Sequence, residues 1–299
     1  MKKLIAFLLA TALILSFSAC KKEPTEAPPP DEFDNFAGGT NAPLTTSIQE
    51  AIITEVETNA EGQTEIVTQI VTEIVTEEYI PAPTTKAEML ALYNNAVNSA
   101  YDAKAGFNKE RMTYNENIEG GGAVFSAAKD LIYKFMGVGE ANKYTESVKK
   151  GNWESEANMH YLRKSTLTEA DITNATCQSG NGQYLVVFEV KDGSSHGSKG
   201  EKVTNAPIDK SGICVGNEDK GYYDHKTGEV IYDALAGTYA GADIKESYSS
   251  AKVSAIIDAK TGNIVSLKVE FDLNVQIDIK ITKGTATATT NIVYRDFVY

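Results

Sequence analysis

Three cysteines and three histidines are the side chains with the widest chemical reach in this 299-residue chain. A thiol can accept an acyl group, form a disulfide or bind a metal ion. Cys177 and Cys214 could cross-link to each other or remain two buried free thiols, and the sequence leaves both readings open. No histidine has a His or Cys neighbour at ligand spacing; the three are His160, His196 and His225. We therefore predict neither a metal site nor a bound cofactor.

Several short motifs place a serine where acyl transfer would need one. Ser147 and Lys150 are spaced as Ser-x-x-Lys, Ser179 and Asn181 as Ser-x-Asn, and residues 193–197 read Gly-Ser-Ser-His-Gly. Ser147 lies in a polar stretch instead of opening an apolar helix. Residues 193–197 are followed by a polar loop, whereas a nucleophile elbow leads straight into a helix. The sequence thus predicts no catalytic residue and no enzyme activity.

The third cysteine ends a secretion signal. Lys2 and Lys3 precede an apolar run over residues 4–15, and small residues follow up to Cys20. This stretch resembles the signal of bacterial lipoproteins, in which the cysteine is lipidated on sulfur and becomes the first residue of the mature protein. The resemblance implies a palmitate-type lipid attachment at Cys20 and a signal peptide over residues 1–19.

The same resemblance implies an extracytoplasmic location, with the protein lipid-anchored to the outer face of the cell membrane. Phe17 stands where lipoprotein signals usually carry Leu, Val or Ile. The alternative reading is plain secretion after cleavage behind Ser18.

Residues 20–83 have a different composition from the rest of the chain. Seven of the eight prolines lie there, and residues 21–83 carry 13 Asp and Glu against two Lys. Residues 84–299 carry 28 acidic against 24 basic side chains. An acidic segment with few aromatic residues cannot bury enough apolar surface to order itself. We therefore expect residues 20–83 to be a disordered stalk that lifts a folded domain off the membrane.

Within this stalk, residues 64–79 contain a Thr-Glu-Ile-Val repeat. A four-residue period drifts around a helix, and adjacent Ile and Val put apolar groups on both faces of a strand. The repeat thus gives neither element one clean apolar face. We interpret it as part of the stalk, and the alternative is a partner-binding or self-pairing segment.

A single domain is expected over residues 84–299, beginning with two helices. Thr85 and Glu88 are spaced as a capping box, followed by apolar residues at helical spacing from Leu90 to Tyr101. Apolar residues recur at three- and four-residue spacing over 124–135, before Gly137, and predict a second helix.

After the helices, the pattern changes to strands. Residues 179–182 read Ser-Gly-Asn-Gly between two β-type runs and predict a hairpin turn, and Asp-x-Lys-Thr-Gly at 224–228 and 258–262 predicts two more turns. Strict alternation over 265–281 predicts an antiparallel sheet with one buried face, and its length predicts a bend or a reversal near 272–274. The expected fold class is α+β, with two N-terminal helices packed on one face of a curved antiparallel sheet that ends in a C-terminal meander.

This order of elements resembles the open half-barrel of lipoprotein carriers and lipid-binding lipoproteins. The Lys86-Ala87-Glu88-Met89-Leu90 helix start and the turn at 258–262 are similar to those in surface lipoproteins of Gram-positive, Clostridia-like bacteria, and that likeness implies no activity. The half-barrel resemblance implies a membrane-anchored, non-catalytic binding module for an apolar small molecule. The alternative is a structural or interaction protein of the cell envelope with a filled core and a protein partner. A near-neutral domain lacks the basic face that nucleic acid would need.

Overall fold

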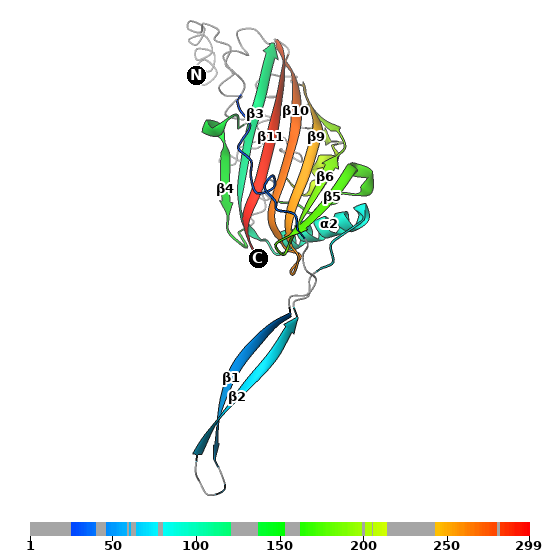
Figure 1. Cartoon of the computed structure of the whole chain (residues 1–299). Helices are drawn as coiled ribbons and strands as arrows, with labels where there is room; N and C mark the ends of the chain where they lie inside the picture. Colours follow the sequence, from blue (N-terminus) through cyan, green and yellow to red (C-terminus); the bar gives the residue numbers. More distant parts are fainter. Residues whose placement is uncertain are drawn as a thin grey trace.

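The computed structural model describes residues 25–39, 46–58, 60, 64–76, 80–120, 137–152, 162–198, 201–204, 206–213, 243–279 and 282–299. Figure 1 shows their arrangement. One α-helix lies in the described residues, α2 (Lys86–Asp102). The strands are β1 (Thr46–Thr58), β2 (Thr64–Thr76), β3 (Gly106–Gly120), β4 (Tyr144–Val148), β5 (Ile172–Gly180), β6 (Gln183–Val190), β7 (Gly193–Ser198), β8 (Glu201–Thr204), β9 (Asp243–Asp258), β10 (Ile264–Ile279) and β11 (Thr282–Val298). Short 3-10 turns occupy Glu140–Asn142, Glu169–Asp171 and Pro207–Ser211.

Nine of these strands form one antiparallel sheet. Its main order is β4-β3-β11-β10-β9-β6-β5, and β7 pairs with β8 and with β9. The consecutive strands β9, β10 and β11 lie side by side at its centre, which confirms the predicted C-terminal meander. β1 and β2 form a separate two-stranded hairpin.

Helix α2 begins at the predicted capping box. The Glu88 backbone N–H donates to Thr85 Oγ1 at 3.2 Å, and Thr85 N donates to the Glu88 carboxylate at 2.9 Å. Hydrogen bonds from the backbone N–H groups of Thr84 and Thr85 lower the pKa of Glu88 to about 2. The helix buries one apolar side, which includes Tyr93 and Val97. Tyr93 packs edge-to-face on Phe188 of β6, with the ring centroids 5.3 Å apart.

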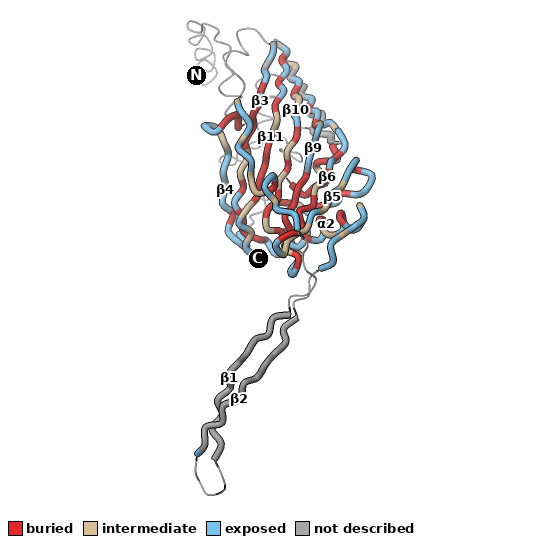
Figure 2. Tube along the Cα trace, in the orientation of Figure 1, coloured by how far each residue is buried: buried red, intermediate tan, exposed pale blue. Residues whose placement is uncertain are grey.

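The large sheet has two different faces. On β10 the odd-numbered residues from Leu267 to Val275 are buried and belong to the main apolar core, which also contains the buried side of α2. The even-numbered positions between them carry Lys268, Glu270 and Asp272. Figure 2 shows the resulting alternation of buried and less buried residues along the central strands. We call the side of the main core and α2 the inner face and the opposite side the outer face.

Three β-bulges bend the long central strands. Each places two residues opposite one, and each contains a non-glycine residue with positive φ: Asn115 in β3 (51°), Ser250 in β9 (54°) and Asp296 in β11 (57°). An extra residue on one strand increases the local twist and curvature. The bulges therefore curve the sheet around the main core.

The expected fold class is wrong. The described residues form mostly antiparallel sheet with one α-helix, not two N-terminal helices on a sheet. Residues 106–120, directly after α2, form β3, whose inner-face positions include Lys109, Arg111 and Thr113. Because these inner positions are polar, β3 lacks the apolar alternation that marks a strand in a sequence. The second expected helix, over residues 124–135, lies outside the described residues.

The chain does not reverse near residues 272–274, because β10 runs as one strand over 16 residues. The bulge of β9 lies beside this place, opposite the step from Glu270 to Asp272 in β10. The predicted turn at 179–182 is confirmed. β5 and β6 meet at Asn181 and Gly182, with φ values of 52° and 72°, as a two-residue hairpin needs.

The turn predicted at residues 258–262 is confirmed and joins β9 to β10. Asp258 Oδ1 accepts hydrogen bonds from the Lys260 N–H at 3.1 Å and the Thr261 N–H at 2.7 Å, and Gly262 has a φ of 72°. This is the local Asp and Gly chemistry from which the turn was predicted. The matching turn at 224–228 lies outside the described residues.

Candidate functional site: a strap on the outer face and a separate hairpin

The segment over residues 25–39, here called the strap, crosses the outer face of the large sheet. At one end the Asn115 N–H of β3 donates to the Thr25 carbonyl at 2.9 Å. At the other end Ser179 Oγ of β5 donates to the Gly39 carbonyl at 3.1 Å. Figure 1 shows this dark blue segment running across the sheet between these strands. The strap differs from the disordered stalk expected over residues 20–83.

An aromatic side chain fixes the middle of the strap. Phe33 is 8% exposed and forms a second, smaller apolar core with Leu185 of β6, Ile256 of β9 and Val293 of β11. These three sheet residues alternate with neighbours that point into the main core, so they lie on the outer face. Burying a phenylalanine side chain contributes about 1.5–3 kcal/mol, which favours the strap's position on the sheet.

A compact turn presents Phe33 to the sheet. Asp31 Oδ1 accepts the Phe33 N–H at 3.0 Å, and the Asp31 carbonyl accepts the Asn35 backbone N–H at 3.1 Å and its side-chain amide at 2.7 Å. These bonds satisfy backbone groups that no strand pairs. The turn over residues 31–35 is thus preorganised by its own Asp and Asn side chains.

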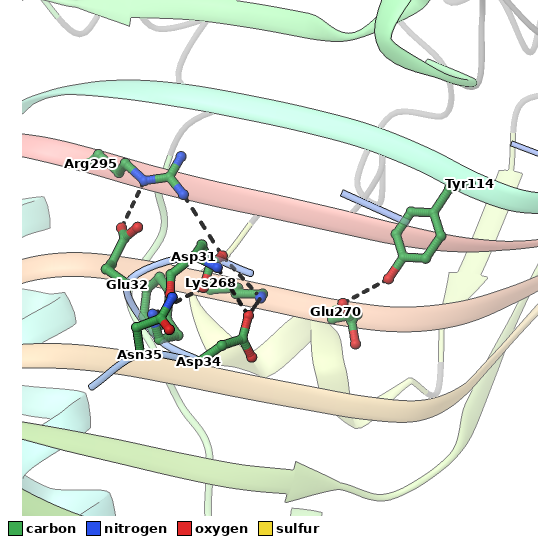
Figure 3. A network of polar contacts seen from close by, with 9 residues as sticks. Asp31, Glu32, Asp34, Asn35, Tyr114, Lys268, Glu270 and Arg295 are labelled. Atoms are coloured by element: carbon green, nitrogen blue, oxygen red, sulfur yellow. Dashed lines mark hydrogen bonds and ion pairs between the residues drawn. The ribbon is translucent and has the colours of Figure 1, made fainter. Parts of the chain in front are cut away.

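Two basic residues of the sheet hold the acidic side chains of this turn, as Figure 3 shows. Lys268 of β10 forms a 3.0 Å ion pair with Asp31, and each of these side chains is 13% exposed. Arg295 of β11 contacts Glu32 through Nε at 2.7 Å. The Lys268 ammonium also lies 5.8 Å from the centre of the Phe33 ring. Charge and apolar contact therefore act on the same four-residue stretch, Asp-Glu-Phe-Asp.

The Lys268 contact changes the acidity of Asp31. Burial alone would raise the pKa of this carboxyl group, and the hydrogen bond and positive charge of Lys268 are the main causes that oppose it. The backbone N–H groups of Phe33 and Asp34 act in the same direction, so the pKa lies below its ordinary value of 3.8. Asp31 is therefore ionised at neutral pH, and its charged form favours the docked strap.

Contacts with strands β3 and β5 fix the two ends of the strap. The buried carboxylate of Glu116 accepts the Thr25 N–H at 2.9 Å and its hydroxyl at 3.2 Å. At the other end, a Cβ atom added to Gly180 would overlap the Ala37 carbonyl oxygen. Gly180 is thus needed for the strap to pass the end of β5.

A second polar pair lies on the outer face next to the strap. Tyr114 of β3 donates its hydroxyl to Glu270 of β10 at 2.8 Å and so bridges across β11 (Figure 3). Burial is the largest cause of the raised pKa of Tyr114, and the hydrogen bond to Glu270 adds to it. The phenol therefore stays protonated at neutral pH and acts as a structural donor.

The hairpin of β1 and β2 follows the strap and is built differently. Its 13 residue pairs run without a bulge from Thr46↔Thr76 to Thr58↔Thr64. In the described part of the chain, β1 and β2 are not paired to any other strand. Figure 1 shows the hairpin away from the large sheet, beyond the end where the Ile80 N–H donates to the Ala259 carbonyl at 2.7 Å. The Thr-Glu-Ile-Val repeat forms β2, so this part of the expected stalk is a paired strand.

The structure gives different information on the three cysteines. Cys177 lies on β5 and is half-buried against the main core. The disulfide considered with Cys214 stays a prediction, because Cys214 lies outside the described residues. Burial raises the pKa of the Cys177 thiol to about 11, which keeps it protonated and a weak nucleophile at neutral pH. Cys20 and Cys214 lie outside the described residues.

The serine motifs do not form an acyl-transfer site. Ser147 lies in strand β4, where its hydroxyl donates to Asn108 Oδ1 at 2.6 Å, and not at the start of a helix. Ser179 and Asn181 belong to the β5–β6 hairpin. Ser195, the middle residue of 193–197, lies in β7 and pairs with Thr204 of β8 and Glu246 of β9.

Histidine and metal chemistry gain no support from the described residues. His196 lies in β7, and His160 and His225 lie outside the described part of the chain. Within that part, no group of three or more His, Cys, Asp or Glu side chains is arranged to hold a metal ion. No helix among the described residues is long and apolar enough to cross a membrane.

Sequence reasoning missed the strap, although the sequence contains a signal for it. Phe33 and Phe36 are the two phenylalanines of an otherwise proline-rich, acidic segment. Both belong to the outer-face core, Phe36 at its margin. An aromatic pair in a segment assigned to disorder thus marks the stretch that the domain binds. The partners Lys268 and Arg295 are more than 230 residues away, and no local pattern points to them.

No protein-family model, curated protein or solved structure matches the chain.

Proposed function

We propose that the protein is a non-catalytic interaction module of the cell envelope, held on the outer face of the cell membrane by a lipid on Cys20. One observation carries the proposal. The strap enters the folded domain at Thr25, bound to Asn115 and Glu116 of β3, only five residues after Cys20.

This short connection changes how the anchor would hold the domain. Five residues of fully extended chain span at most about 17 Å. A lipid on Cys20 therefore holds the large sheet next to the membrane, instead of at the end of a long stalk. The hairpin lies between the strap and α2 in the sequence, so it is an insertion that the anchored domain presents.

Carriage of an apolar ligand is the weaker reading. The space expected to hold a ligand lies between helix and sheet, where Tyr93 and Phe188 are fully buried and in direct contact. A ligand at this place would have to separate α2 from the sheet. The filled contact favours the envelope interaction protein over the carrier.

The anchor is tested by replacing its cysteine and, as a matched control, another cysteine of the chain. Cys20→Ser is expected to release the protein from washed membranes and to abolish incorporation of labelled palmitate. Cys177→Ser leaves the attachment residue intact and should stay membrane-bound and labelled. Retention of the Cys20→Ser protein in washed membranes would rule out the lipid anchor.

The position of the domain is tested by energy transfer to a dye in the lipid headgroup region. One fluorophore is placed at Glu140, adjacent to Gly139, which lies against Thr25; a second is placed at Ala60, between the hairpin strands. Each is introduced as a cysteine in a Cys177→Ala/Cys214→Ala background. We expect strong transfer from position 140 and weak transfer from position 60. Equal transfer from both positions would contradict a domain held close to the membrane.

A further inference from the structure

The register of the hairpin gives its repeat a regular arrangement on two faces. Each even-numbered residue of β1 pairs with an even-numbered residue of β2, as in Ile52↔Ile70 and Thr54↔Thr68. Because successive positions of a strand alternate between faces, all even positions share one face. A four-residue repeat keeps Thr and Ile at even positions and Glu or Gln and Val at odd positions throughout β2.

The even face carries almost no charge. Its 14 positions hold seven threonines, six aliphatic residues and one glutamate, Glu50. The aliphatic positions of this face are Ile48, Ile52, Val56, Ile66, Ile70 and Ile74. The odd face holds the other four glutamates of the hairpin, Glu55, Glu57, Glu65 and Glu73. The hairpin therefore has one charged face and one face of Thr and Ile.

The cross-strand rows of the even face are also arranged symmetrically about the middle of the hairpin. From the open end to the tip, cross-strand rows alternate between threonine and aliphatic residues, and the central row is Ile52↔Ile70. The sequence of row types is the same read in either direction from that centre, apart from Glu50. A two-fold interface requires such a self-complementary surface, because each copy offers the same surface to the other. A second copy placed antiparallel would set aliphatic rows against aliphatic rows.

A two-stranded hairpin would be stabilised by such a partner. Two strands alone are marginally stable in water, since they lack a second layer on which to bury an apolar face. β1 and β2 pair only with each other among the described strands, and no third strand extends their sheet. A partner layer on the even face would supply the missing contact.

We propose that the even face of the hairpin binds the same face of a second copy of this chain. The interface measures about 44 Å along the strands and about 10 Å across them, so two copies together bury about 900 Å². That area is at the lower end for specific complexes. The dimer is therefore weak in dilute solution and strong on a membrane, where lipid anchors concentrate the copies. This inference rests on the proposed function only for that membrane enhancement.

Cross-linking at two adjacent positions tests the face directly. In a Cys177→Ala/Cys214→Ala background, Thr68→Cys places a thiol on the even face and Gln69→Cys places one on the odd face. A short thiol cross-linker applied to whole cells should give a covalent dimer of this chain at least about tenfold more efficiently with Thr68→Cys. Equal cross-linking at both positions, or cross-linking of neither to a second copy, would overturn the proposal.

A pair of identical substitutions at adjacent positions provides a second test. Ile52→Asp puts a carboxylate in the central row of the even face, and Ile53→Asp makes the same change on the odd face. Dimerisation of detergent-solubilised protein, measured by sedimentation, should weaken at least about tenfold with Ile52→Asp and little with Ile53→Asp. If the two substitutions weaken it equally, the even face is not the interface.

The two tests are independent of the anchor. Loss of membrane attachment in Cys20→Ser reports on the proposed function alone. Thr68→Cys cross-linking repeated with Cys20→Ser protein at high concentration reports on the hairpin alone. Cross-linking of position 68 to a different protein, without a dimer of this chain, would also overturn the proposal.

Discussion

The strap and the hairpin lie in the same acidic, proline-rich part of the chain, but only the strap is built into the domain. The strap has no regular secondary structure, yet Phe33 is buried and Asp31 and Glu32 are paired with basic residues of the sheet. The hairpin has a complete ladder of 13 residue pairs and pairs with no other described strand. Backbone regularity and attachment to a core are thus separate properties. The strap is attached through a buried aromatic residue and matched charges, whereas the ladder of the hairpin joins it to no other described strand.

The largest expected difference between the two regions follows from truncating one apolar side chain in each. Phe33→Ala removes the centre of the outer-face core and should lower the free energy of unfolding by about 2–4 kcal/mol. Ile52→Ala in the hairpin should change the unfolding of the large sheet by less than about 0.5 kcal/mol. Urea unfolding of both variants measures the difference. A similar loss in both would show that the hairpin is part of the cooperative unit.

The next effect concerns the ion pair that holds the strap. Lys268→Ala leaves Asp31 mostly buried without its nearest cation and should destabilise the domain by about 1–3 kcal/mol. Lys283→Ala is the matched control, because Lys283 pairs with Asp278 at a site where both side chains are largely exposed. Its loss should leave the free energy of unfolding nearly unchanged. Equal values in chemical denaturation would mean that burial does not strengthen the Lys268 contact.

Docking of the strap should also depend on pH. The pKa of Asp31 is lowered in the folded protein, so its stabilising effect is complete above the ordinary value of 3.8 and is lost as pH falls through the folded value. Hydrogen exchange of residues 31–35, corrected for the intrinsic effect of pH, should show protection from neutral pH down to about 4 and lose it below.

Asp31→Asn serves as the control for this pH dependence. The variant lacks the ionisable carboxyl group, so its strap should be less protected at neutral pH and should show little further change on acidification. A strap that loses protection at the same low pH in both proteins would assign the transition to another group.

The smallest effect is expected when the hairpin is removed. Replacing residues 46–76 by a flexible Gly-Ser linker should shift the thermal unfolding midpoint of the large sheet by no more than about 1–2 °C. Deletion of the strap, by contrast, exposes Leu185, Ile256 and Val293 and should lower the midpoint clearly. A large shift on loss of the hairpin would show that the hairpin, like the strap, stabilises the large sheet.

The features predicted well from the sequence are those set by residues close together in the chain. The capping box of Thr85 and Glu88, the turn at Asn181-Gly182 and the turn at Asp258 each act within about five residues. The alternation over β10 predicted a sheet with one buried face because the side-chain period of a strand is fixed. These predictions needed no knowledge of partners.

The predictions that failed needed information from distant parts of the chain. Polar inner-face residues hid β3, and pairing on both sides makes one strand of the β10 run, which looked too long for one.

The sequence by itself determined the local signals: a capped helix, tight turns and one strongly alternating strand. The secretion signal that ends at Cys20 stays a prediction. Only the tertiary structure decided that Asp31, Glu32 and Phe33 bind Lys268, Arg295 and the outer-face core, and that the domain therefore begins within a few residues of Cys20. The physical reason is the range of the interactions. Caps and turns form within one short segment, whereas the strap is held by residues from six strands that come together only when the sheet has formed.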